Sequence, residues 1–348
     1  MQNTLELNWY GFLTPFGGYG INALRWLVYL TRLGYDIRVH DAYKPKFGTD
    51  EWKALSEEEQ VILNKRWVKY KIGIIESTPW EFGLCDNEIK IANTMCESDA
   101  IGKEWVDPSN LMDHILVPNE FMKKVFETSG VTKPVRVIPH GVDSGRFQYF
   151  DRPKRSPFTF GTVGYLNERK GFFELVRAFA SEFGPEEKVQ LVLKTSNLIY
   201  GYYKNWTDQR IKMIDKHLDT RELNELYQSF DCFVFPSRAE GYGQPPREAM
   251  STGLPTILTN YSGLEDVCNP DFNYPIDPIS LERGVNPVEE QTGNWAKVDI
   301  QELMYWMRHV YENREEAMMK GSRAASEMRN HHSWNKSAIK MSEFLNSL

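Results

Sequence analysis

Short apolar runs with strand character alternate with amphipathic stretches along most of the chain. The runs predict strands over residues 5–13, 35–43, 70–77, 88–94, 113–119, 135–141, 158–166, 189–195 and 231–237. Apolar residues three to four positions apart predict helices over residues 20–34, 56–67, 120–130, 171–184, 299–330 and 333–346. This alternation is typical of α/β domains, because a helix that crosses back over the sheet makes successive strands parallel.

The alternation stops between residues 143 and 157. The stretch "DSGRFQYFDRPKRSP" is polar, contains prolines and has no period, which is typical of a linker. A chain of 348 residues also suggests about two domains, at roughly 100–200 residues each. We therefore predict two α/β domains in tandem, residues 1–147 and 148–330.

Composition and charge narrow the class of protein. Hydrophobic residues make up 41% of the chain and the formal net charge is −7, which disfavours both disorder and a large nucleic-acid surface. The four cysteines form no CxxC pair, so a zinc site has little support, and Cys232 is expected to pack inside an apolar strand. Because the sequence shows neither a signal-peptide pattern nor an apolar run of ~18 residues, it predicts a reduced, cytoplasmic protein.

A glycine-rich loop follows the first predicted strand. In "TPFGGYGINA", Gly18, Gly20 and Ala23 fit the GxGxxG/A pattern of dinucleotide-binding loops, and Asp41 comes 23 positions after Gly18. These residues leave three interpretations open. The loop can form a nicotinamide-cofactor site, a tight strand-to-helix turn that needs glycine, or a turn whose backbone amides approach another ligand.

Cations stand at the carboxyl ends of two strands in the second half of the chain. Arg169 and Lys170 lie where a helix begins near Gly171, although the positive end of the helix dipole opposes them there. Lys194 ends the next strand. Because ligands of open α/β sheets bind outside these strand ends, the cations predict a site for an anion such as pyrophosphate. The alternative is a pair of solvated charges.

The stretch "PSRAEGYGQPPREAM" follows the strand that ends at Ser237, so it lies at the same predicted edge. Its glycines allow the backbone to approach a ligand, and its prolines suit the start of a helix. We therefore place Glu248 in the first helical turn, where the dipole favours a carboxylate that can bind a diol such as ribose. Glu240 is expected on the loop, nearer an open cleft. The alternative is a tight turn with one dipole-stabilising glutamate.

These motifs resemble the retaining glycosyltransferases of glycosyltransferase family 4, which have the GT-B fold. "EGYGQPPREAMSTGLPTI", with seven residues between its two glutamates, resembles their donor-site signature. "DHILVPNEFMKKVFETSGVTKPVRVIPHGVD" resembles the end of their first domain, and "VGYLNERKGFFELVRAF" and "ELYQSFDCFVFPSRAEGYG" resemble their second. The resemblance covers nearly the whole chain. It implies two Rossmann-like α/β domains with parallel sheets facing across a cleft, and a helix at about 331–348 that crosses back to the first domain.

The resemblance implies that a nucleoside-diphosphate sugar binds mainly to the second domain, and that no metal or other cofactor is needed because cations take its place. Lys170 would hold the pyrophosphate, Glu248 the ribose hydroxyls, and Glu240 the transferred sugar. The implied donor-binding residues are Gly18, Arg169, Lys170, Lys194, Gly241, Tyr242, Gly243 and Glu248. The candidate catalytic residues are Glu240, Glu97 and Lys170.

Two positions depart from the family pattern. Tyr165 stands where the family usually carries an arginine after the strand glycine, so Arg169 or Lys194 is expected to supply that charge. The first-domain loop "NTMCESDAIGKEW" has Glu97 and no histidine, whereas many members use a histidine beside the sugar. Glu97 is expected to orient the acceptor hydroxyl or share its proton, which is general acid–base chemistry. Alternatively it caps the segment that follows.

The implied reaction moves a hexose or similar sugar to an acceptor hydroxyl with retention of configuration. Because no carboxylate nucleophile can be identified, front-side attack assisted by the departing phosphate is the expected route. A sugar-nucleotide epimerase, a nicotinamide-dependent oxidoreductase and an inert binding module are the alternatives.

The acceptor is left open between a glycan, a lipid-linked molecule and a small molecule, with nucleic acid a weaker alternative. In "LNKRWVKYKIG", cations lie among Trp67, Tyr70 and Ile72. Such a stretch is either a helix end with solvated lysines or a surface that touches an anionic membrane or a nucleic-acid strand. The cations are Lys65, Arg66, Lys69 and Lys71. A peripheral place on the inner face of a membrane is therefore the alternative to a purely cytoplasmic one.

Overall fold

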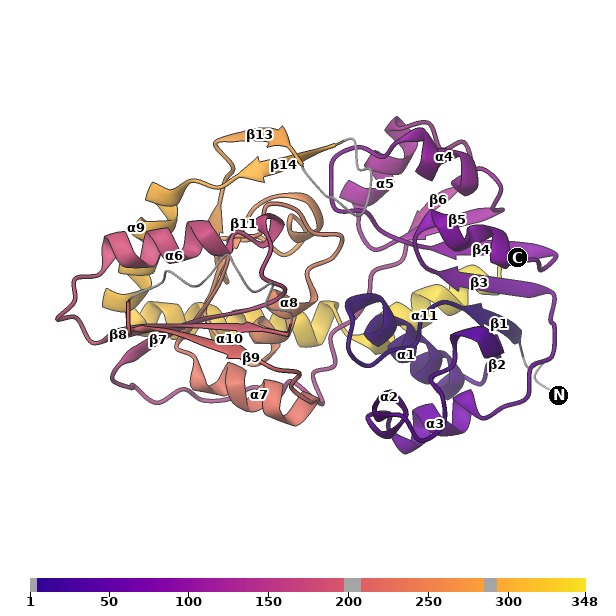
Figure 1. The fold of residues 1–348 in the computed structure, drawn as a ribbon, viewed down its shortest axis with the longest axis horizontal. Helices are drawn as coiled ribbons and strands as arrows, with labels where there is room; N and C mark the ends of the chain where they lie inside the picture. The colour runs from indigo at the N-terminus through magenta and orange to yellow at the C-terminus, as the bar shows by residue number, and fades with distance from the viewer. Residues whose placement is uncertain (1–4, 197–207, 285–292) are drawn as a thin grey trace. The chain divides into compact units, whose positions relative to one another are not determined.

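The structure is a computed structural model that describes residues 5–196, 208–284 and 293–348 (Figure 1). Contacts within the chain divide it into two compact units. Unit 1 contains the described residues 5–141 and 332–348, and unit 2 contains the described residues from 142 to 331. Each unit holds a six-stranded sheet. The prediction of two α/β domains with parallel sheets is confirmed.

The sheet of unit 1 is parallel, with the strand order β2-β1-β3-β4-β5-β6. The elements of unit 1 are β1 (Glu6–Tyr10), α1 (Gly18–Arg32), β2 (Asp36–Val39), η1 (Asp41–Tyr43), α2 (Asp50–Lys53), α3 (Glu57–Leu63), β3 (Ile72–Glu76), η2 (Pro79–Leu84), β4 (Ile89–Asn93), α4 (Lys103–Ser109), β5 (His114–Val117), α5 (Glu120–Thr128), β6 (Val135–Val137) and α11 (Trp334–Leu345).

Helices cover both faces of this sheet. On one face, α1, α3 and α11 pack over strand residues such as Ile74 and Ile91. There the ring of Trp334 meets that of Trp26 edge to face, with 5.0 Å between the centroids. On the other face, α4 and α5 pack over residues such as Ile75. The C-terminal helix is therefore part of unit 1, as Figure 1 shows in yellow beside α1.

The main sheet of unit 2 is parallel, with the strand order β12-β11-β10-β7-β8-β9, and β13 and β14 form a separate antiparallel pair. The elements of unit 2 are β7 (Phe158–Val163), η3 (Glu168–Lys170), α6 (Phe172–Glu182), β8 (Val189–Thr195), β9 (Ile211–Asp215), α7 (Thr220–Ser229), β10 (Cys232–Phe235), α8 (Gln244–Ser251), β11 (Thr256–Thr259), η4 (Ser262–Leu264), β12 (Tyr274–Ile276), β13 (Ser280–Arg283), β14 (Asn294–Lys297), α9 (Ile300–Glu312) and α10 (Arg314–His331). Helices α6 and α9 cover one face, while α7, α8 and α10 cover the other.

Each sheet has a point where the strand order reverses. In unit 1 the chain builds outward from β1 to β2 and then continues from β3 on the other side of β1. In unit 2 it builds outward from β7 to β9 and continues from β10 on the other side of β7. The loops that leave two adjacent strands diverge at such a switch point, so ligands bind there, outside the carboxyl ends. The switch points are β1/β3 and β7/β10.

Three local predictions differ from the structure. The stretch 143–157 is not a free linker, because Phe147 is buried in unit 2 and its carbonyl oxygen accepts a 2.8 Å hydrogen bond from Ser251. The predicted helix 299–330 is two helices, since α9 ends at Glu312 and α10 begins at Arg314. Finally, α3 ends at Leu63, so the basic stretch after it is not a helix end.

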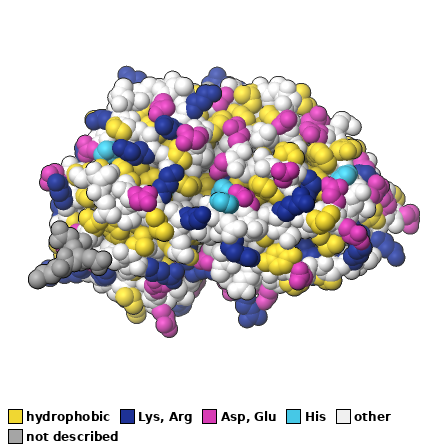
Figure 2. All heavy atoms as spheres, turned by 180° about the vertical axis from the view of Figure 1, so that it is seen from behind, with side chains coloured by type: hydrophobic (Ala, Val, Ile, Leu, Met, Phe, Trp, Pro, Cys, Tyr) yellow, Lys and Arg dark blue, Asp and Glu magenta, His cyan; other side chains and the backbone are white. Residues whose placement is uncertain are grey.

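Two cations of the basic stretch form short ion pairs with carboxylates of unit 1. Lys65 pairs with Asp36 at 2.8 Å, and Lys69 pairs with Asp86 at 2.6 Å. On the face shown in Figure 2, cationic and anionic side chains are interspersed. Across the described part of the chain, no helix combines the length and the apolar character that a membrane span requires.

Candidate active site

Two loops meet at the switch point of unit 2. The loop after β7 contains η3 and ends at Gly171, whose φ of 67° is left-handed. A Cβ atom on Gly171 would lie 2.0 Å from the carbonyl oxygen of Pro236, at the end of β10. The backbone N–H of Arg238 also donates to the carbonyl oxygen of Arg169 at 2.7 Å. These contacts hold the loop after β7 against the loop after β10.

Glu240 is the centre of a buried cluster formed by these loops. Its Oε1 accepts hydrogen bonds from Lys170 Nζ at 2.6 Å, Arg169 Nη1 at 3.2 Å and Ser237 Oγ at 2.5 Å. Its backbone N–H donates to Ser262 Oγ at 2.8 Å. We expected Glu240 nearer an open cleft, but it is only 4% exposed. The two cations that we predicted to hold an anion thus hold this carboxylate.

The electrostatics of the cluster favour the ionised form of Glu240. Burial alone would raise the pKa of this carboxyl, but the charges of Lys170 and Arg169 and the hydrogen bonds from Lys170 and Ser237 lower it below its usual range. With both cations charged and Glu240 ionised, the three side chains carry a net charge of about +1. A buried positive cluster at the carboxyl edge of a parallel sheet can stabilise an anion, including charge that develops on a leaving group.

The geometry of the loop after β10 depends on one glycine and one arginine. Gly243 has a φ of 78°, and a Cβ atom there would lie 2.3 Å from the side chain of Leu264. Arg247 is fully buried and donates to the carbonyl oxygens of Tyr242 at 3.0 Å and Gly263 at 2.8 Å. It also pairs with Asp266 at 2.7 Å. Arg247 therefore ties the 241–243 backbone to the turn that follows β11.

Glu248 lies deeper in α8 than we predicted. The helix begins at Gln244, with the two prolines in its first turn, so Glu248 is in the second turn and not the first. The prediction was wrong because Gly243 already acts as the N-cap. Glu248 accepts a 2.9 Å hydrogen bond from the hydroxyl of Tyr227. Burial raises the pKa of Glu248 to about 7, although the bond from Tyr227 and the charge of Lys194 lower it.

Lys194 lies near this carboxyl at the end of β8. Burial lowers the pKa of Lys194, and the charges of Glu248 and Asp215 oppose that shift. Tyr165, in the loop after β7, is 42% exposed. The predicted donor-binding residues of the second domain thus lie at the ends of β7, β8 and β10, on the loops that follow these strands, or in α8.

The other predicted residues lie in unit 1. Gly18 is the first residue of α1, and a Cβ atom there would meet nothing within 4 Å. Gly20 is different, because its Cβ would lie 2.3 Å from the carbonyl oxygen of Thr14. Asp41 is exposed and pairs with Lys44 at 2.7 Å. Glu97 is half-buried in the loop after β4.

Sequence reasoning missed several residues that shape the cluster. Ser237, Ser262, Tyr227 and Arg247 all contact the predicted residues. Ser237 could have been found, since it ends the strand beside Glu240. Tyr227 and Arg247 gave no signal, because a tyrosine in an amphipathic helix and an arginine after two prolines are common on protein surfaces.

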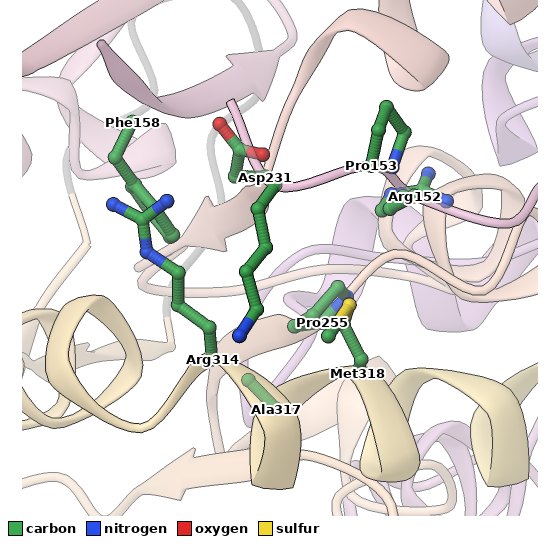
Figure 3. Close-up of a pocket in the computed structure, with 9 residues that line it drawn as sticks. Arg152, Pro153, Phe158, Asp231, Pro255, Arg314, Ala317 and Met318 are labelled. Atoms are coloured by element: carbon green, nitrogen blue, oxygen red, sulfur yellow. The ribbon is translucent and has the colours of Figure 1, made fainter. Parts of the chain in front are cut away.

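Two further observations concern metal binding and cavities. In the described ranges, no group of three or more His, Cys, Asp or Glu side chains is arranged to hold a metal ion. A small hollow lies at the opposite edge of the sheet, where Phe158 begins β7 and Asp231 precedes β10 (Figure 3). Its volume of about 20 Å³ has room for about one water molecule. A substrate therefore has no place there.

The segment that contains the Glu240 cluster matches a known protein family. Residues 148–291 match the family "Glycosyl transferases group 1". An uncharacterized glycosyltransferase of Methanocaldococcus jannaschii is 30% identical over 158 residues, which are 41% of this chain and 40% of that protein. Mannosylfructose-phosphate synthase of Agrobacterium fabrum is 29% identical over 153 residues, 38% of this chain and 34% of that protein. The chain thus matches less than half the length of either relative.

Solved structures show the same fold over the whole chain. Sucrose-phosphate synthase from Thermosynechococcus elongatus has a TM-score of 0.74 at 15% identity, and the match covers 99% of both chains. Anabaena HepE, solved with UDP and glucose, has a TM-score of 0.73 at 14% identity, covering 99% of this chain and 100% of that one. The chain therefore has the two-domain GT-B fold, and its residues 148–291 match the group 1 glycosyl transferases.

Proposed function

We propose that the protein is a glycosyltransferase that moves a sugar from a nucleoside-diphosphate sugar to an acceptor hydroxyl, with retention of configuration. The observation that carries the proposal is the Lys170–Arg169–Glu240 cluster. It lies at the switch point of unit 2, within the segment that matches the group 1 glycosyl transferases. The glycosyltransferase and sugar-phosphate synthase names of the relatives agree with this assignment.

In this proposal the diphosphate of the donor binds to Lys170 and Arg169. Both cations are already desolvated and oriented by Glu240, so little reorganisation is needed when charge develops on the departing diphosphate. Glu248 accepts hydrogen bonds from the ribose hydroxyls, with Lys194 and Tyr227 fixing its position. The backbone of residues 241–243, which Arg247 holds in place, contacts the sugar and its phosphates.

The proposed transfer proceeds on one face of the sugar. The bond between the anomeric carbon and the diphosphate oxygen breaks as the acceptor oxygen bonds to that carbon. The acceptor proton passes to the departing diphosphate, which leaves as nucleoside diphosphate. Glu97 orients the acceptor hydroxyl or shares its proton. The reaction needs no metal, because Lys170 and Arg169 balance the charge of the leaving group.

The alternatives explain less of the molecule. A nicotinamide-dependent oxidoreductase would explain the glycine pattern of the first loop. The structure gives these residues other roles, because a Cβ atom on Gly20 would collide with Thr14 and Asp41 already pairs with Lys44. A sugar-nucleotide epimerase shares the architecture, yet it would convert the donor without an acceptor. An inert binding module would bind the donor without ever cleaving it.

The donor test is a thermal-shift screen of UDP-, GDP-, ADP- and dTDP-sugars, followed by calorimetry with the nucleoside diphosphate of the best donor. We expect Lys170→Ala to weaken binding by about 10- to 150-fold, because a charge-assisted hydrogen bond contributes roughly 1.5–3 kcal/mol. The control is Lys188→Ala, which removes an exposed lysine of the same unit. If the wild type stabilises with none of the donors, or if Lys170→Ala binds as tightly as the control, the proposal fails.

A further inference from the structure

Arg238 stands between two residues that hold the Glu240 cluster together. Before it, Ser237 Oγ donates to Glu240 Oε1 at 2.5 Å, and after it the carbonyl oxygen of Ala239 accepts from Arg169 Nη1 at 2.6 Å. The backbone N–H of Arg238 donates to the carbonyl oxygen of Arg169 at 2.7 Å. A displacement of Arg238 would therefore move both neighbours and the contacts that they make with the cluster.

The guanidinium of Arg238 joins three separate segments of unit 2. Its Nη1 donates to Oε1 of Glu168 in η3 at 2.8 Å, and its Nη2 donates to Oε1 of Glu282 in β13. Its Nε donates to the carbonyl oxygen of Ala296 in β14 at 3.1 Å. The guanidinium carbon also lies 5.5 Å from the centroid of the Trp295 ring, within the range of a cation–π contact. The planar fork of one arginine can bind several acceptors in fixed directions, so it links these segments rigidly.

Main-chain contacts join the β13–β14 pair to the same loop. Figure 1 shows this pair in orange, and it belongs to neither six-stranded sheet. The N–H of Ala296 donates to the carbonyl oxygen of Arg238 at 2.8 Å. The hydroxyl of Tyr261, in the turn after β11, donates to the carbonyl oxygen of Asn294 at 3.2 Å. Because two strands alone are only marginally stable, the position of the pair depends on such contacts.

The guanidinium of Arg238 is desolvated, whereas its two carboxylate partners reach solvent. The Arg238 side chain is 5% exposed, compared with 62% for Glu168 and 45% for Glu282. A buried cation that loses a partner is left with an uncompensated charge, which destabilises the structure. The cation is therefore confined to the geometry that keeps its partners. That geometry includes the loop after β7, because Glu168 directly precedes Arg169 and Lys170 in η3.

We propose that Arg238 is a positioning residue, which holds Arg169 and Lys170 in the orientation that binds a pyrophosphate group. Its side chain acts through η3 and the loop after β10, without contact to the donor. The β13–β14 pair takes part through Glu282, which fixes one arm of the guanidinium fork. The inference rests on the proposed function, whose donor carries this pyrophosphate, and it adds the β13–β14 pair to the segments on which donor binding depends.

Hydrogen bonding and charge make opposite predictions for Glu282. Its carboxylate would repel a bound anion, so removal of this charge should leave anion binding unchanged or strengthen it if charge alone matters. If the hydrogen bonds of Arg238 position the site, loss of this acceptor should instead weaken anion binding. Glu282→Ala removes both the charge and the acceptor, whereas Glu282→Gln removes only the charge, since its amide oxygen still accepts. The two variants therefore separate the two effects.

The test measures binding to the full chain by calorimetry, with inorganic pyrophosphate and with UDP, GDP, ADP and dTDP as probes. We expect Glu282→Ala to weaken binding at least about fivefold, and Glu282→Gln to stay within about twofold of the wild type. Arg238→Met should lose at least as much affinity as Glu282→Ala. Adding Glu282→Ala to Arg238→Met should cause no further loss, because the two residues act as one unit.

The matched control is Glu186→Ala, which removes the same charge from an exposed glutamate between α6 and β8. It should bind the probes like the wild type. The proposal is overturned if Glu282→Ala binds as tightly as this control or more tightly, or if Glu282→Gln loses as much affinity as Glu282→Ala. Melting curves check that each variant is folded at the temperature of the assay. If Arg238→Met does not fold, the two Glu282 variants still decide the question.

The two kinds of probe separate this proposal from the proposed function. If the wild type and Glu282→Ala bind a nucleoside diphosphate equally well, the positioning role is wrong and the glycosyltransferase assignment stands. If the wild type binds pyrophosphate in a Glu282-dependent way and binds no nucleoside diphosphate, the positioning role stands and the assignment of a nucleotide-sugar donor falls. If only a nucleoside diphosphate binds, its affinities decide the positioning role. If the wild type binds neither kind of probe, both proposals fall.

Discussion

The buried carboxyl of Glu248 gives unit 2 a pH-dependent stability that a single substitution should remove. Its pKa is about 7 in the folded protein, compared with an ordinary value of 4.5. The perturbation is Glu248→Gln, which keeps the size of the side chain and its ability to accept the hydrogen bond from Tyr227. Glutamine does not titrate, so the difference between wild type and variant isolates this group.

The sign of the effect follows from the direction of the shift. Below pH 4.5 the carboxyl is protonated in both states, and its contribution to stability is fully present. Between pH 4.5 and 7 the unfolded chain releases the proton while the folded chain keeps it, so stability is lost as the pH rises. The pKa of Glu248 differs by about 2.5 between the folded and unfolded states, and a pKa difference of one corresponds to about 1.4 kcal/mol. The free energy of unfolding therefore falls by about 3 kcal/mol over this pH range. Above pH 7 the loss levels off.

The assay is urea unfolding of the wild type and Glu248→Gln at pH 4.5, 6 and 8. The unfolding free energy of the wild type minus that of the variant should fall by about 3 kcal/mol from the lowest to the highest pH. Glu186→Gln, an exposed glutamate of the same unit, should show no such trend. A difference that is the same at all three pH values would refute the reasoning, because it would mean that the folded protein keeps Glu248 ionised.

Two further predictions concern the candidate site. Glu97→Gln should retain donor affinity and melting temperature but lose about 10²- to 10⁴-fold in transfer rate, as expected for a proton-handling residue. A normal initial rate with a shifted melting temperature would make Glu97 a cap instead. Gly243→Ala should lower the free energy of unfolding by about 1–3 kcal/mol in urea, because the φ of 78° at Gly243 and the contact with Leu264 leave no place for a Cβ atom. Unchanged stability would contradict the strain that we assign to this turn.

The fold could be predicted because the sequence encodes it locally. Runs such as "CFVFP" are apolar on both faces, which indicates a strand covered by helices on both sides. The start of α8 also had a local signal in its two prolines. The helical turn that contains Glu248 could not be predicted from the sequence. The helix begins after Gly243, and the left-handed backbone of this N-cap is set by its packing against Leu264. Composition alone does not reveal that packing.

The candidate site was predicted in part, for a related reason. Lys170, Arg169 and Glu240 could each be placed at a strand end from the sequence, yet their mutual hydrogen bonds depend on the two loops meeting across Gly171. A cation and an anion about 70 residues apart carry no sign in the sequence that they will pair. Arg247 shows the same limit, since its burial depends on how the loop after β10 closes over it.

The cluster of unit 2 follows one physical logic, in which the chain buries polar groups where the strand order reverses. In unit 2 the buried charges are satisfied internally, because Glu240 pairs with Lys170 and Arg169, and a diphosphate would compete for cations that are already oriented. Desolvated groups destabilise a fold unless something completes them. We therefore expect substitutions that neutralise or remove Glu240 to lower the free energy of unfolding, because they remove the carboxylate that Lys170 and Arg169 share.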